Sequence, residues 1–498
     1  MSTQKLTTEN SQLKTHNSKT LEMRIRLILA LLVFVALGNT LHARDITPQR
    51  TQKAIDRFVD DSLLRHGSVG VIVVDVNNGK MLGGRNTNLA CITASTMKTV
   101  TSSAALELLG ADFTFDTPVY LDGEIHGSTL RGNLVVVGKG DPTLGSVYFK
   151  DNLDIVDEVV ETLKKQGITT IEGKVLVDNS LYYYPAFNGD WCADDLAWDF
   201  GMGLHALNYC DNRMKLAFTG KGDGTVENAH FEPNVPGVQL INRMRPGNED
   251  NVGVLLEYAN PAVVLTGTAA DTSYVFNVSN PTPAALLIDS LSRTLTTSGI
   301  KLENKAFGSS DRRWLLMTHK SPVLSDIIAS LLERSDNMFT EGLLKAIAVN
   351  SHRKPTEAEG VAVIDSLFTA RGIDASGKFQ YDGSGLARNN KAPVKFFADM
   401  LTYMTNRRFG AKQLRLVDLM TRLGINAKIG TQIQASSISG MIASKSGSMR
   451  DVQCYVGYFP ADNPKYAWAV LVNNWHGSRS DLKEMIDRLL LGIFDPMR

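Results

Sequence analysis

The stretch from Ser95 to Gly110 is the feature that most constrains how this 498-residue chain can fold. It has small residues at its start and apolar ones behind them, and Gly110 follows the last apolar residue, as glycines do where helices end. We therefore predict a buried helix over residues 95–110. Residues three apart lie on one face of a helix, so Ser95 and Lys98 are expected to project side by side.

Ser95 and Lys98 can supply the two groups that nucleophilic catalysis needs, a hydroxyl nucleophile and a base. A hydroxyl is a weak nucleophile until a neighbouring group takes its proton, and a lysine in apolar surroundings loses its own proton more easily than one in water. The start of a helix also presents backbone N–H groups that can stabilise an oxyanion. The same spacing recurs elsewhere, so the pair gains weight only from its place at the start of an apolar helix. The other serines with a lysine three residues on are Ser2, Ser11, Ser298, Ser351 and Ser480.

The remaining pattern predicts one domain interrupted by another. An amphipathic helix at 50–65 and a hairpin around Asn77-Asn78-Gly79 precede the Ser95 helix. From residue 112 to about 282, short β-type runs are broken by Gly, Asn, Asp and Pro. Strands predicted between 440 and 473 are expected to pair with the early hairpin. The predicted parts are a tail and signal peptide (1–43), the first part of the catalytic domain (44–111), a β-rich inserted region of one or more domains (112–282) and the second part of the catalytic domain (283–498).

The N-terminus has the order of a secretory signal. Arg24 and Arg26 precede an apolar run from Leu27 to Leu37, and small or polar residues follow to about Ala43. The run is short for a membrane span, so we expect an exported, periplasmic protein, with Met23 as an alternative start. An uncleaved membrane anchor is the alternative, and contact with the membrane is expected only through this segment or peripherally.

Composition excludes several kinds of partner. The chain has 52 Lys plus Arg and 52 Asp plus Glu, so no net field attracts it to nucleic acid. Its cysteines, Cys91, Cys192, Cys210 and Cys454, show no metal-binding spacing, and we expect no metal and no cofactor. Export permits disulfides: Cys192 with Cys210 is the pair to test, whereas Cys91 and Cys454 are at least as consistent with buried free thiols.

Two stretches downstream can complement Ser95. Ser335-Asp336-Asn337 offers a hydroxyl and, two residues on, an amide, although on its own it is more typical of a helix cap or turn. Lys445-Ser446-Gly447-Ser448 lies in a strand pattern, with a glycine where a ligand backbone can approach. On its own it is more typical of an edge strand protected by a lysine. The combination, in this order, favours a catalytic site.

Together the three stretches resemble the signature of the penicillin-binding-protein and serine β-lactamase superfamily, which is Ser-x-x-Lys, Ser-x-Asn and Lys-Thr/Ser-Gly. More narrowly, the chain is similar to the class C low-molecular-mass penicillin-binding proteins of the penicillin-binding protein 4 type, which are D-alanyl-D-alanine carboxypeptidases and endopeptidases of family S13. That family has a long insertion between its first two motifs, and here almost half of the chain separates Ser95 from Ser335. The stretches 138–144 and 382–388 also resemble the family. The resemblance implies an α+β fold, with an antiparallel sheet and flanking helices interrupted by the insertion.

The resemblance also implies a role for each motif residue. Ser95 would be the acylated nucleophile and Lys98 its general base. Ser335 would relay a proton toward the leaving D-alanine, and Asn337 would hold the amide of the substrate. Lys445 would complete the proton network and attract the terminal carboxylate.

Further contacts follow from the same resemblance. Ser446, where threonine is commoner, would hydrogen-bond the terminal carboxylate beside Gly447. The backbone N–H groups of Ser95 and Ser448 would form the oxyanion hole.

Four residues outside these motifs are candidates for peptide recognition. Asp195 and Phe200 match positions that, in relatives, face the diamino-acid side chain of the stem peptide. Arg388 would hold a carboxylate, and Arg450 stands where such relatives carry a neutral polar residue. For these four, an ordinary surface or core role is as consistent with the sequence.

The leading interpretation is an exported serine peptidase that cleaves D-Ala-D-Ala bonds in peptidoglycan stem peptides and is inhibited covalently by β-lactams. A serine β-lactamase or esterase of the same fold is an alternative. Because no Glu-x-x-Leu-Asn stretch lies between Ser335 and Lys445 to activate a deacylating water, β-lactam hydrolysis is expected to be slow. A non-catalytic cell-wall-binding protein is another alternative, which the complete set of acylation residues disfavours.

Overall fold

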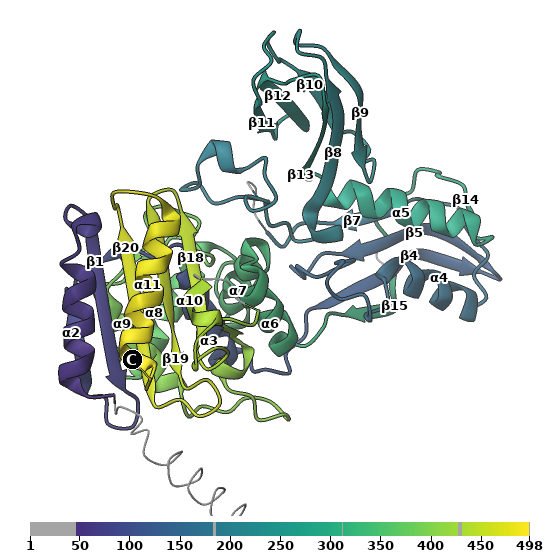
Figure 1. Cartoon of the computed structure of the whole chain (residues 1–498). Coiled ribbons are helices and arrows are strands. Elements are labelled where there is room, and N and C mark those ends of the chain that lie inside the picture. The colour runs from purple at the N-terminus through teal and green to yellow at the C-terminus, as the bar shows by residue number, and fades with distance from the viewer. Residues whose placement is uncertain (1–45, 183–185, 311, 427–430, 498) are drawn as a thin grey trace, which may run out of the picture.

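The computed structural model describes residues 46–182, 186–310, 312–426 and 431–497. It shows a helix-covered sheet, which we call the body, and a large inserted part beside it (Figure 1). The predicted signal segment lies outside the described residues. Among the helices that the structure describes, none combines the length and the apolar character needed to cross a bilayer.

The body is built on a six-stranded antiparallel sheet that joins the two ends of the chain. The predicted pairing of the C-terminal strands with the early hairpin is confirmed, because β20 runs beside β1 from Ser68 opposite Asn473 to Asp75 opposite Tyr466. In spatial order the strands are β17 (Thr421–Arg422), β18 (Ala443–Met449), β19 (Val452–Phe459), β20 (Tyr466–Asn473), β1 (Ser68–Asp75) and β2 (Met81–Arg85).

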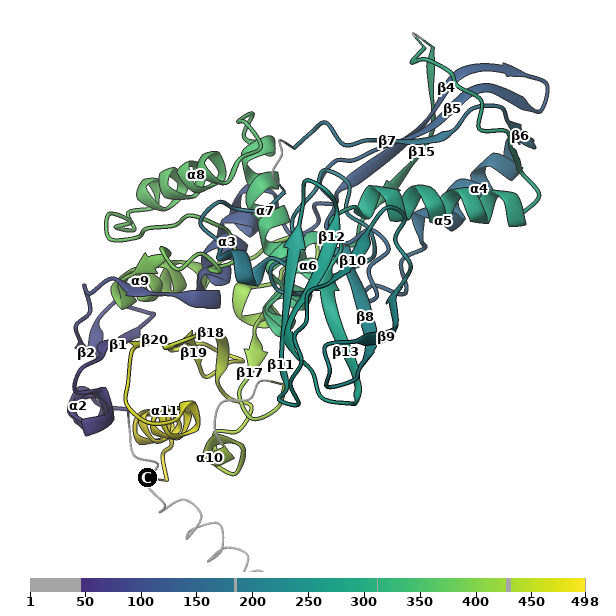
Figure 2. The ribbon, with the colours of Figure 1, turned by 90° about the horizontal axis from the view of Figure 1, so that it is seen from above.

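Both faces of this sheet are covered by helices, which explains why its central strands are continuous apolar runs. Alternate side chains of a strand point to opposite faces, so Val71 and Val73 of β1 pack into one core and Ile72 and Val74 into another. Figure 2 shows the two helical layers on either side of the sheet. One layer contains α2 (Pro48–Val59), α10 (Thr431–Gln434) and α11 (Arg479–Phe494); the other contains α3 (Met97–Leu108), α6 (Leu324–Arg334), α7 (Asn337–Asn350), α8 (Glu357–Ala370) and α9 (Val394–Met404).

In the residues that the structure describes, the inserted part has three sheets and two α-helices around an apolar core. Its largest sheet contains β14 (Lys301–Leu302), β6 (Thr170–Ile171), β5 (Thr129–Val137), β4 (Asp116–His126) and β15 (Arg313–Lys320), with β7 (Val175–Asp178) paired to β5. The helices are α4 (Ile155–Lys165) and α5 (Pro283–Thr297). The smaller sheets contain β8 (Arg213–Gly220), β9 (Val226–Glu232) and β13 (Ser273–Ser279), and β10 (Gln239–Asn242), β11 (Asn251–Glu257) and β12 (Ala262–Thr268). A separate short pair joins β3 (Cys91–Ile92) to β16 (Lys391–Ala392).

The inserted part continues beyond the predicted boundary at residue 282. Helix α5 places Leu286 and Leu291 in the core of the insertion, and β15 pairs with β4 along its length. The insertion therefore ends at about Lys320, where the chain returns to the body and enters α6. Helix α5 was assigned to the body because its sequence is helical, but a helical pattern does not reveal which sheet the helix covers.

All four cysteines are free in the structure. The bond between Cys192 and Cys210 that an exported protein permits is therefore not formed here. Cys91 and Cys454 are buried thiols, and burial raises the pKa of Cys91 to about 11. Neither of these two thiols is prepared for reaction at neutral pH, because the reactive form is the thiolate.

Candidate active site

Ser95 lies in a tight turn that begins the central helix of the body. The predicted helix over 95–110 is present as a 3-10 turn (Ala94–Thr96) followed directly by α3. Ala94 has a positive φ of 44°, which is uncommon for a residue with a side chain. Two glycines allow close backbone contacts with this turn: a Cβ at Gly385 would lie 1.9 Å from the Ala94 carbonyl oxygen, and one at Gly447 would lie 2.9 Å from the Ser95 nitrogen.

Lys98 points back along α3 to the Ser95 hydroxyl, as the three-residue spacing predicts. Its side chain is fully buried. The Nζ donates to Ser95 Oγ at 2.9 Å, to Asn337 Oδ1 at 2.5 Å and to the Ser384 carbonyl oxygen at 2.8 Å. Of these three acceptors, only the Ser95 hydroxyl also carries a proton to donate. When Lys98 is neutral, the lone pair of its nitrogen can therefore accept a hydrogen bond from the Ser95 hydroxyl. The two carbonyl-type oxygens have no proton to donate to it.

Burial lowers the pKa of Lys98 to about 8, against the opposing effect of the negative charges of Asp382, Glu341 and Asp336. An ordinary lysine is almost wholly protonated at neutral pH. Lys98 is instead close to the pH at which it can accept a proton, which is the property that a general base requires.

The second motif is placed by the junction between two helices. Helix α6 ends at Arg334, and Ser335 takes a left-handed conformation with φ 61° and ψ 41°. Asp336 then caps α7, because its side chain accepts from the backbone N–H of Phe339 at 2.9 Å. This turn directs Asn337 toward Lys98, and the Nδ2 of Asn337 donates to the carbonyl oxygen of Phe200, at 2.6 Å.

The third motif brings a second buried lysine to Ser335. Lys445 lies on β18 and is 2% exposed. Its Nζ donates to Ser335 Oγ at 2.9 Å and to the Ser446 carbonyl oxygen at 2.8 Å. Burial lowers the pKa of Lys445 well below its usual value, and the neighbouring charge of Lys98 lowers it further. The site thus pairs each of two serines with its own buried lysine.

The end of β18 is held by an arginine that the sequence analysis missed. Arg479, the first residue of α11, donates to Ser448 Oγ and to the Met449 carbonyl oxygen, the latter at 2.7 Å. Ser448 Oγ in turn donates to Gln453 Oε1 at 3.2 Å. Ser446 and Ser448 are exposed and Gly447 is buried. Gly447 is the residue of this stretch that faces the Ser95 turn.

The four residues proposed for peptide recognition lie on three separate loops. Asp195 ends a 3-10 turn (Ala193–Asp195) of the inserted part, and burial raises its pKa although the charge of Arg388 opposes this. The Phe200 side chain is 43% exposed, while its carbonyl binds Asn337. Arg388 is exposed in the loop after Asp382, and Arg450 is exposed in the turn between β18 and β19. The structure thus brings Asp195, Phe200 and Arg388 toward one side of the site and places Arg450 past the end of β18.

A turn at residues 382–385 forms the floor beneath Lys98, and it was noted in the sequence only as a family-like stretch. Asp382 is fully buried and accepts four hydrogen bonds. The donors are Trp191 Nε1 at 2.9 Å, Gly385 N at 2.7 Å, Ala387 N at 2.6 Å and Asn390 Nδ2 at 2.8 Å. Because Trp191 belongs to the inserted part, this carboxylate joins the insertion to the floor of the site.

These contacts assemble a site for acyl transfer. It has a hydroxyl next to a base of lowered pKa, a second hydroxyl and lysine that can carry a proton, and a helix start beside an approaching strand. No group of three possible metal ligands occurs among the residues that the structure describes.

Comparison with known proteins finds relatives over most of the chain. Residues 51–491 match the D-Ala-D-Ala carboxypeptidase 3 (S13) family. The chain is 24% identical over 448 residues to the D-alanyl-D-alanine carboxypeptidase of Actinomadura sp. strain R39, which covers 86% of this chain and 81% of that protein. It is 25% identical over 444 residues to the D-alanyl-D-alanine carboxypeptidase DacB of Haemophilus influenzae, covering 86% and 89%.

The fold also matches a solved structure. The crystal structure of penicillin binding protein 4 from Haemophilus influenzae superimposes with a TM-score of 0.72 at 22% identity, covering 87% of this chain and 99% of that one. Its complex with a β-lactam gives a TM-score of 0.69. The predicted α+β fold with an antiparallel sheet and flanking helices is thereby confirmed.

Proposed function

The chain belongs to the S13 family of D-Ala-D-Ala carboxypeptidases and is a serine-type carboxypeptidase, and we propose that it cleaves D-Ala-D-Ala bonds of peptidoglycan stem peptides through an acyl intermediate on Ser95. The observation that carries the proposal is the 2.9 Å contact between Lys98 Nζ and Ser95 Oγ at a fully buried lysine. This contact supplies a base for a hydroxyl that is otherwise a weak nucleophile.

In the acylation step, neutral Lys98 takes the proton of Ser95 while Oγ attacks the carbonyl carbon of the penultimate D-alanine. The resulting oxyanion would be stabilised by the N–H groups of Ser95 and Ser448. When the tetrahedral intermediate collapses, the C–N bond breaks and the nitrogen of the terminal D-alanine needs a proton. Ser335, bonded to Lys445, is placed to deliver that proton and to be reprotonated by the lysine.

Deacylation would use the same groups in reverse. The proton that Lys98 took during acylation first passes to Lys445, which gave one up through Ser335. Neutral Lys98 then takes a proton from a water as the water attacks the acyl carbon, and returns it to Ser95 Oγ as the bond from Oγ to the acyl carbon breaks. The products are the shortened peptide, with a new carboxylate, and the free enzyme.

Substrate recognition is assigned to groups that surround this chemistry. Asn337 would hold the amide of the peptide, and Lys445 and Ser446 would attract its terminal carboxylate. Gly447 would let the peptide lie against β18. These roles agree with the exposed hydroxyl of Ser446 and with the direction of Asn337 into the site.

Residues of the loops beside the site would bind the side chains and carboxylates of the stem peptide. Asp195 would pair with the ammonium group of the diamino acid, Phe200 would cover its aliphatic part, and Arg388 and Arg450 would bind carboxylates. The exposure of Phe200 and Arg388 beside Asp195 supports this arrangement.

β-Lactams are proposed as covalent inhibitors of the same serine. Attack by Ser95 opens the lactam ring, and the leaving nitrogen stays attached to the acyl group and does not diffuse away. We further propose that the protein is exported to the periplasm and also cleaves cross-linked peptides as an endopeptidase. The signal-like pattern of residues 24–43 supports export.

The test is to incubate the purified protein with penicillin and measure its intact mass, beside a Ser95→Ala variant. We expect one drug adduct on the parent and none on the variant, followed by release of D-alanine from D-Ala-D-Ala peptides by the parent alone. Absence of an adduct on the folded parent would contradict the acyl-serine mechanism and would favour a wall-binding protein. Cross-linked muropeptides then test the endopeptidase reaction.

A further inference from the structure

Glu341 is a buried carboxylate that the acyl-transfer mechanism above does not use. It lies on α7 four residues after Asn337, so the two side chains share one face of the helix. Asn337 meets Lys98 at the top of this face, and Glu341, which is 3% exposed, lies deeper in the body. A buried carboxylate is costly unless it is well hydrogen-bonded, so its partners show what it holds in place.

Both oxygens of Glu341 bind the turn beneath Lys98. Oε2 accepts from the backbone N–H of Gly383 and Oε1 from that of Ser384, each at 2.8 Å. The carbonyl oxygen of the same Ser384 accepts from Lys98 Nζ at 2.8 Å. A continuous chain of hydrogen bonds thus runs from Glu341 through one residue of backbone to the amine.

The Ser384 carbonyl differs from the other two acceptors of Lys98. Ser95 Oγ and Asn337 Oδ1 belong to side chains that the reaction itself engages, whereas the Ser384 oxygen is a backbone atom. Its own peptide unit is held by Asp382, which accepts from the N–H of Gly385 at 2.7 Å, and the two preceding peptide units are held by the N–H bonds to Glu341. A carboxylate accepts one of these N–H groups on each of its two oxygens. An amide has a single oxygen, so in the same position its NH2 group would face one of the two N–H donors.

We propose that Glu341 is a positioning residue for the reaction, whose carboxylate fixes the Gly383 and Ser384 peptides and thereby aims the Lys98 amine at Ser95. The inference rests on the proposed acyl-serine function. It assigns a task to a carboxylate that touches neither the substrate nor the nucleophile.

The charge of Glu341 gives the proposal a signature in pH. Lys98 feels the negative charges of Asp382, Glu341 and Asp336, which favour its protonated form, and lies near the positively charged form of Lys445. Where Glu341 is ionised, loss of its charge therefore lowers the pKa of Lys98 below about 8.

Burial and the charges that face Glu341 limit the pH range in which it is ionised. Asp382 and Glu357 raise the pKa of Glu341, after burial, to about 8. Glu357 is itself paired with Lys345 at 3.1 Å.

Two substitutions separate the position of the carboxylate from its charge. Glu341→Gln keeps the length of the side chain and removes the charge, and Glu341→Asp keeps the charge and shortens the reach. The matched control is Glu107→Gln on α3, the helix that carries Lys98. The Glu107 side chain is 2% exposed and binds Arg407 and Tyr403 at 2.6 and 2.9 Å.

The measurement is the second-order rate of penicillin acylation against pH, with the thermal midpoint of each variant. We expect both Glu341 variants to lose on the order of tenfold in the plateau rate, because small displacements of a catalytic group are costly. In Glu341→Gln alone, the upper part of the acid limb, near pH 8, where Glu341 is partly ionised in the parent, should also move to lower pH. Glu107→Gln should lower the thermal midpoint and leave the acid limb of the rate-against-pH profile unchanged.

An unchanged rate and limb in Glu341→Gln, or losses matched by Glu107→Gln, would overturn the proposal. So would failure of both Glu341 variants to fold, which would assign the carboxylate to stability. Failure of the parent to acylate would instead overturn the proposed function, so the two failures are distinguishable.

Discussion

The two buried lysines of the active site differ from a group of arginines at the far end of α9. Lys98 and Lys445 are 0% and 2% exposed, and hydroxyl and carbonyl oxygens surround each Nζ. Burial lowers the pKa of both. Each lysine is thus held in a place where its charge is disfavoured.

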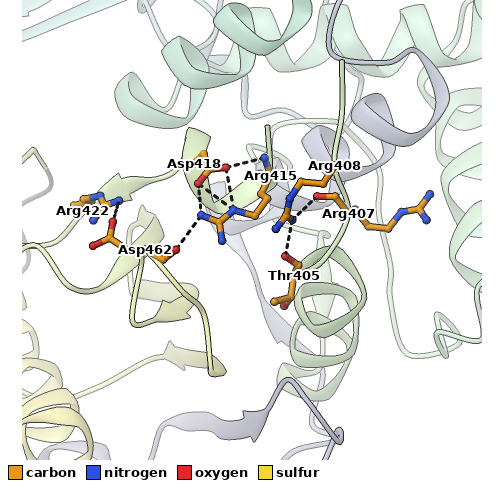
Figure 3. A network of polar contacts seen from close by, with 7 residues as sticks. All are labelled: Thr405, Arg407, Arg408, Arg415, Asp418, Arg422 and Asp462. Carbon is orange, nitrogen blue, oxygen red and sulfur yellow. Dashed lines mark hydrogen bonds and ion pairs between the residues drawn. The ribbon is translucent and has the colours of Figure 1, made fainter. Parts of the chain in front are cut away.

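The arginines lie between the end of α9, the turn Leu416–Leu419, and the loop after β19 (Figure 3). Arg415 binds the carboxylate of Asp418 through two nitrogens, at 2.6 and 3.0 Å, and Arg422 binds Asp462 at 2.7 Å. The bond to Asp418 raises the pKa of Arg415, so pairing keeps this charge in place. The comparison teaches that a reactive lysine needs burial without a directly bonded carboxylate, whereas a structural cation takes the opposite arrangement.

Removing the amine from the buried site should have the largest effect. In Lys98→Met a side chain of similar length fills the same apolar space, but Ser95 loses its base. We expect the acylation rate by penicillin to fall on the order of 10³-fold, with no loss in the thermal midpoint, because no charged group then needs to be buried. Stopped-flow or mass-resolved acylation measures the rate. A variant that acylates at the parent rate would show that Lys98 is not the base.

Displacing the backbone around Ser95 should have the next largest effect. In Gly447→Ala the new Cβ would lie 2.7 Å from the Thr93 carbonyl oxygen and 2.9 Å from the Ser95 nitrogen. Both are backbone atoms, so β18 or the Ser95 turn must shift. We expect acylation to fall on the order of 10²-fold and the thermal midpoint to drop.

Gly308→Ala is the matched control for this substitution. A Cβ at Gly308 meets nothing within 4 Å, so both the rate and the midpoint should remain at the parent value. Equal acylation by Gly447→Ala and Gly308→Ala would contradict the close approach of β18 to Ser95.

The fold class was predicted from the family resemblance of the three motifs, and local patterns added the position of individual elements. The continuous apolar runs of β19 and β20 and the spacing of Ser95 and Lys98 can be read without knowing their partners. The end of the insertion was predicted too early because α5 has the same pattern in either part of the chain. Local pattern shows which elements exist, and packing decides where they lie.

The candidate site was predictable only where residues act through their own side chains. Glu341 and Asp382 act by holding backbone N–H groups, and this use leaves no spacing signal in a single sequence. The only available hint for Glu341 was its place one helical turn after Asn337. Arg479 was missed for a similar reason, since its contacts with Ser448 and Met449 arise only when α11 packs beside β18.

A change of pH tests the buried lysine without any substitution. The reactive form of Lys98 is the neutral amine, which is populated above its pKa of about 8 and is lost as the pH falls. The acylation rate should therefore reach a plateau above about pH 8 and fall about tenfold for each pH unit below it. At pH 7 the expected rate is about a tenth of the plateau. The arginines at the far end of α9 do not titrate in this range. An acylation rate that is flat down to pH 6 would therefore exclude Lys98 as the titrating base.

The smallest effect is expected from breaking the ion pair between Arg422 and Asp462 at the surface. Arg422 lies on β17 beside β18, and its side chain is 33% exposed while that of Asp462 is 87% exposed. Exposed ion pairs contribute about 0.2–1 kcal/mol, so Arg422→Ala should lower the free energy of unfolding by less than about 1 kcal/mol. The acylation rate should stay within about twofold, because paired surface charges are largely screened.

The same comparison should hold when the other partner is changed. Asp462→Asn removes the charge while keeping the shape. Its stability loss should not exceed that of Arg422→Ala, which also removes a hydrogen bond to the Gly440 carbonyl oxygen, and it should shrink in high salt. Denaturant unfolding and the penicillin assay measure the two quantities. A tenfold loss of acylation in either variant would show that the arginine group acts on β18 and so on Lys445, and the distinction between the reactive and the structural cations would then fail.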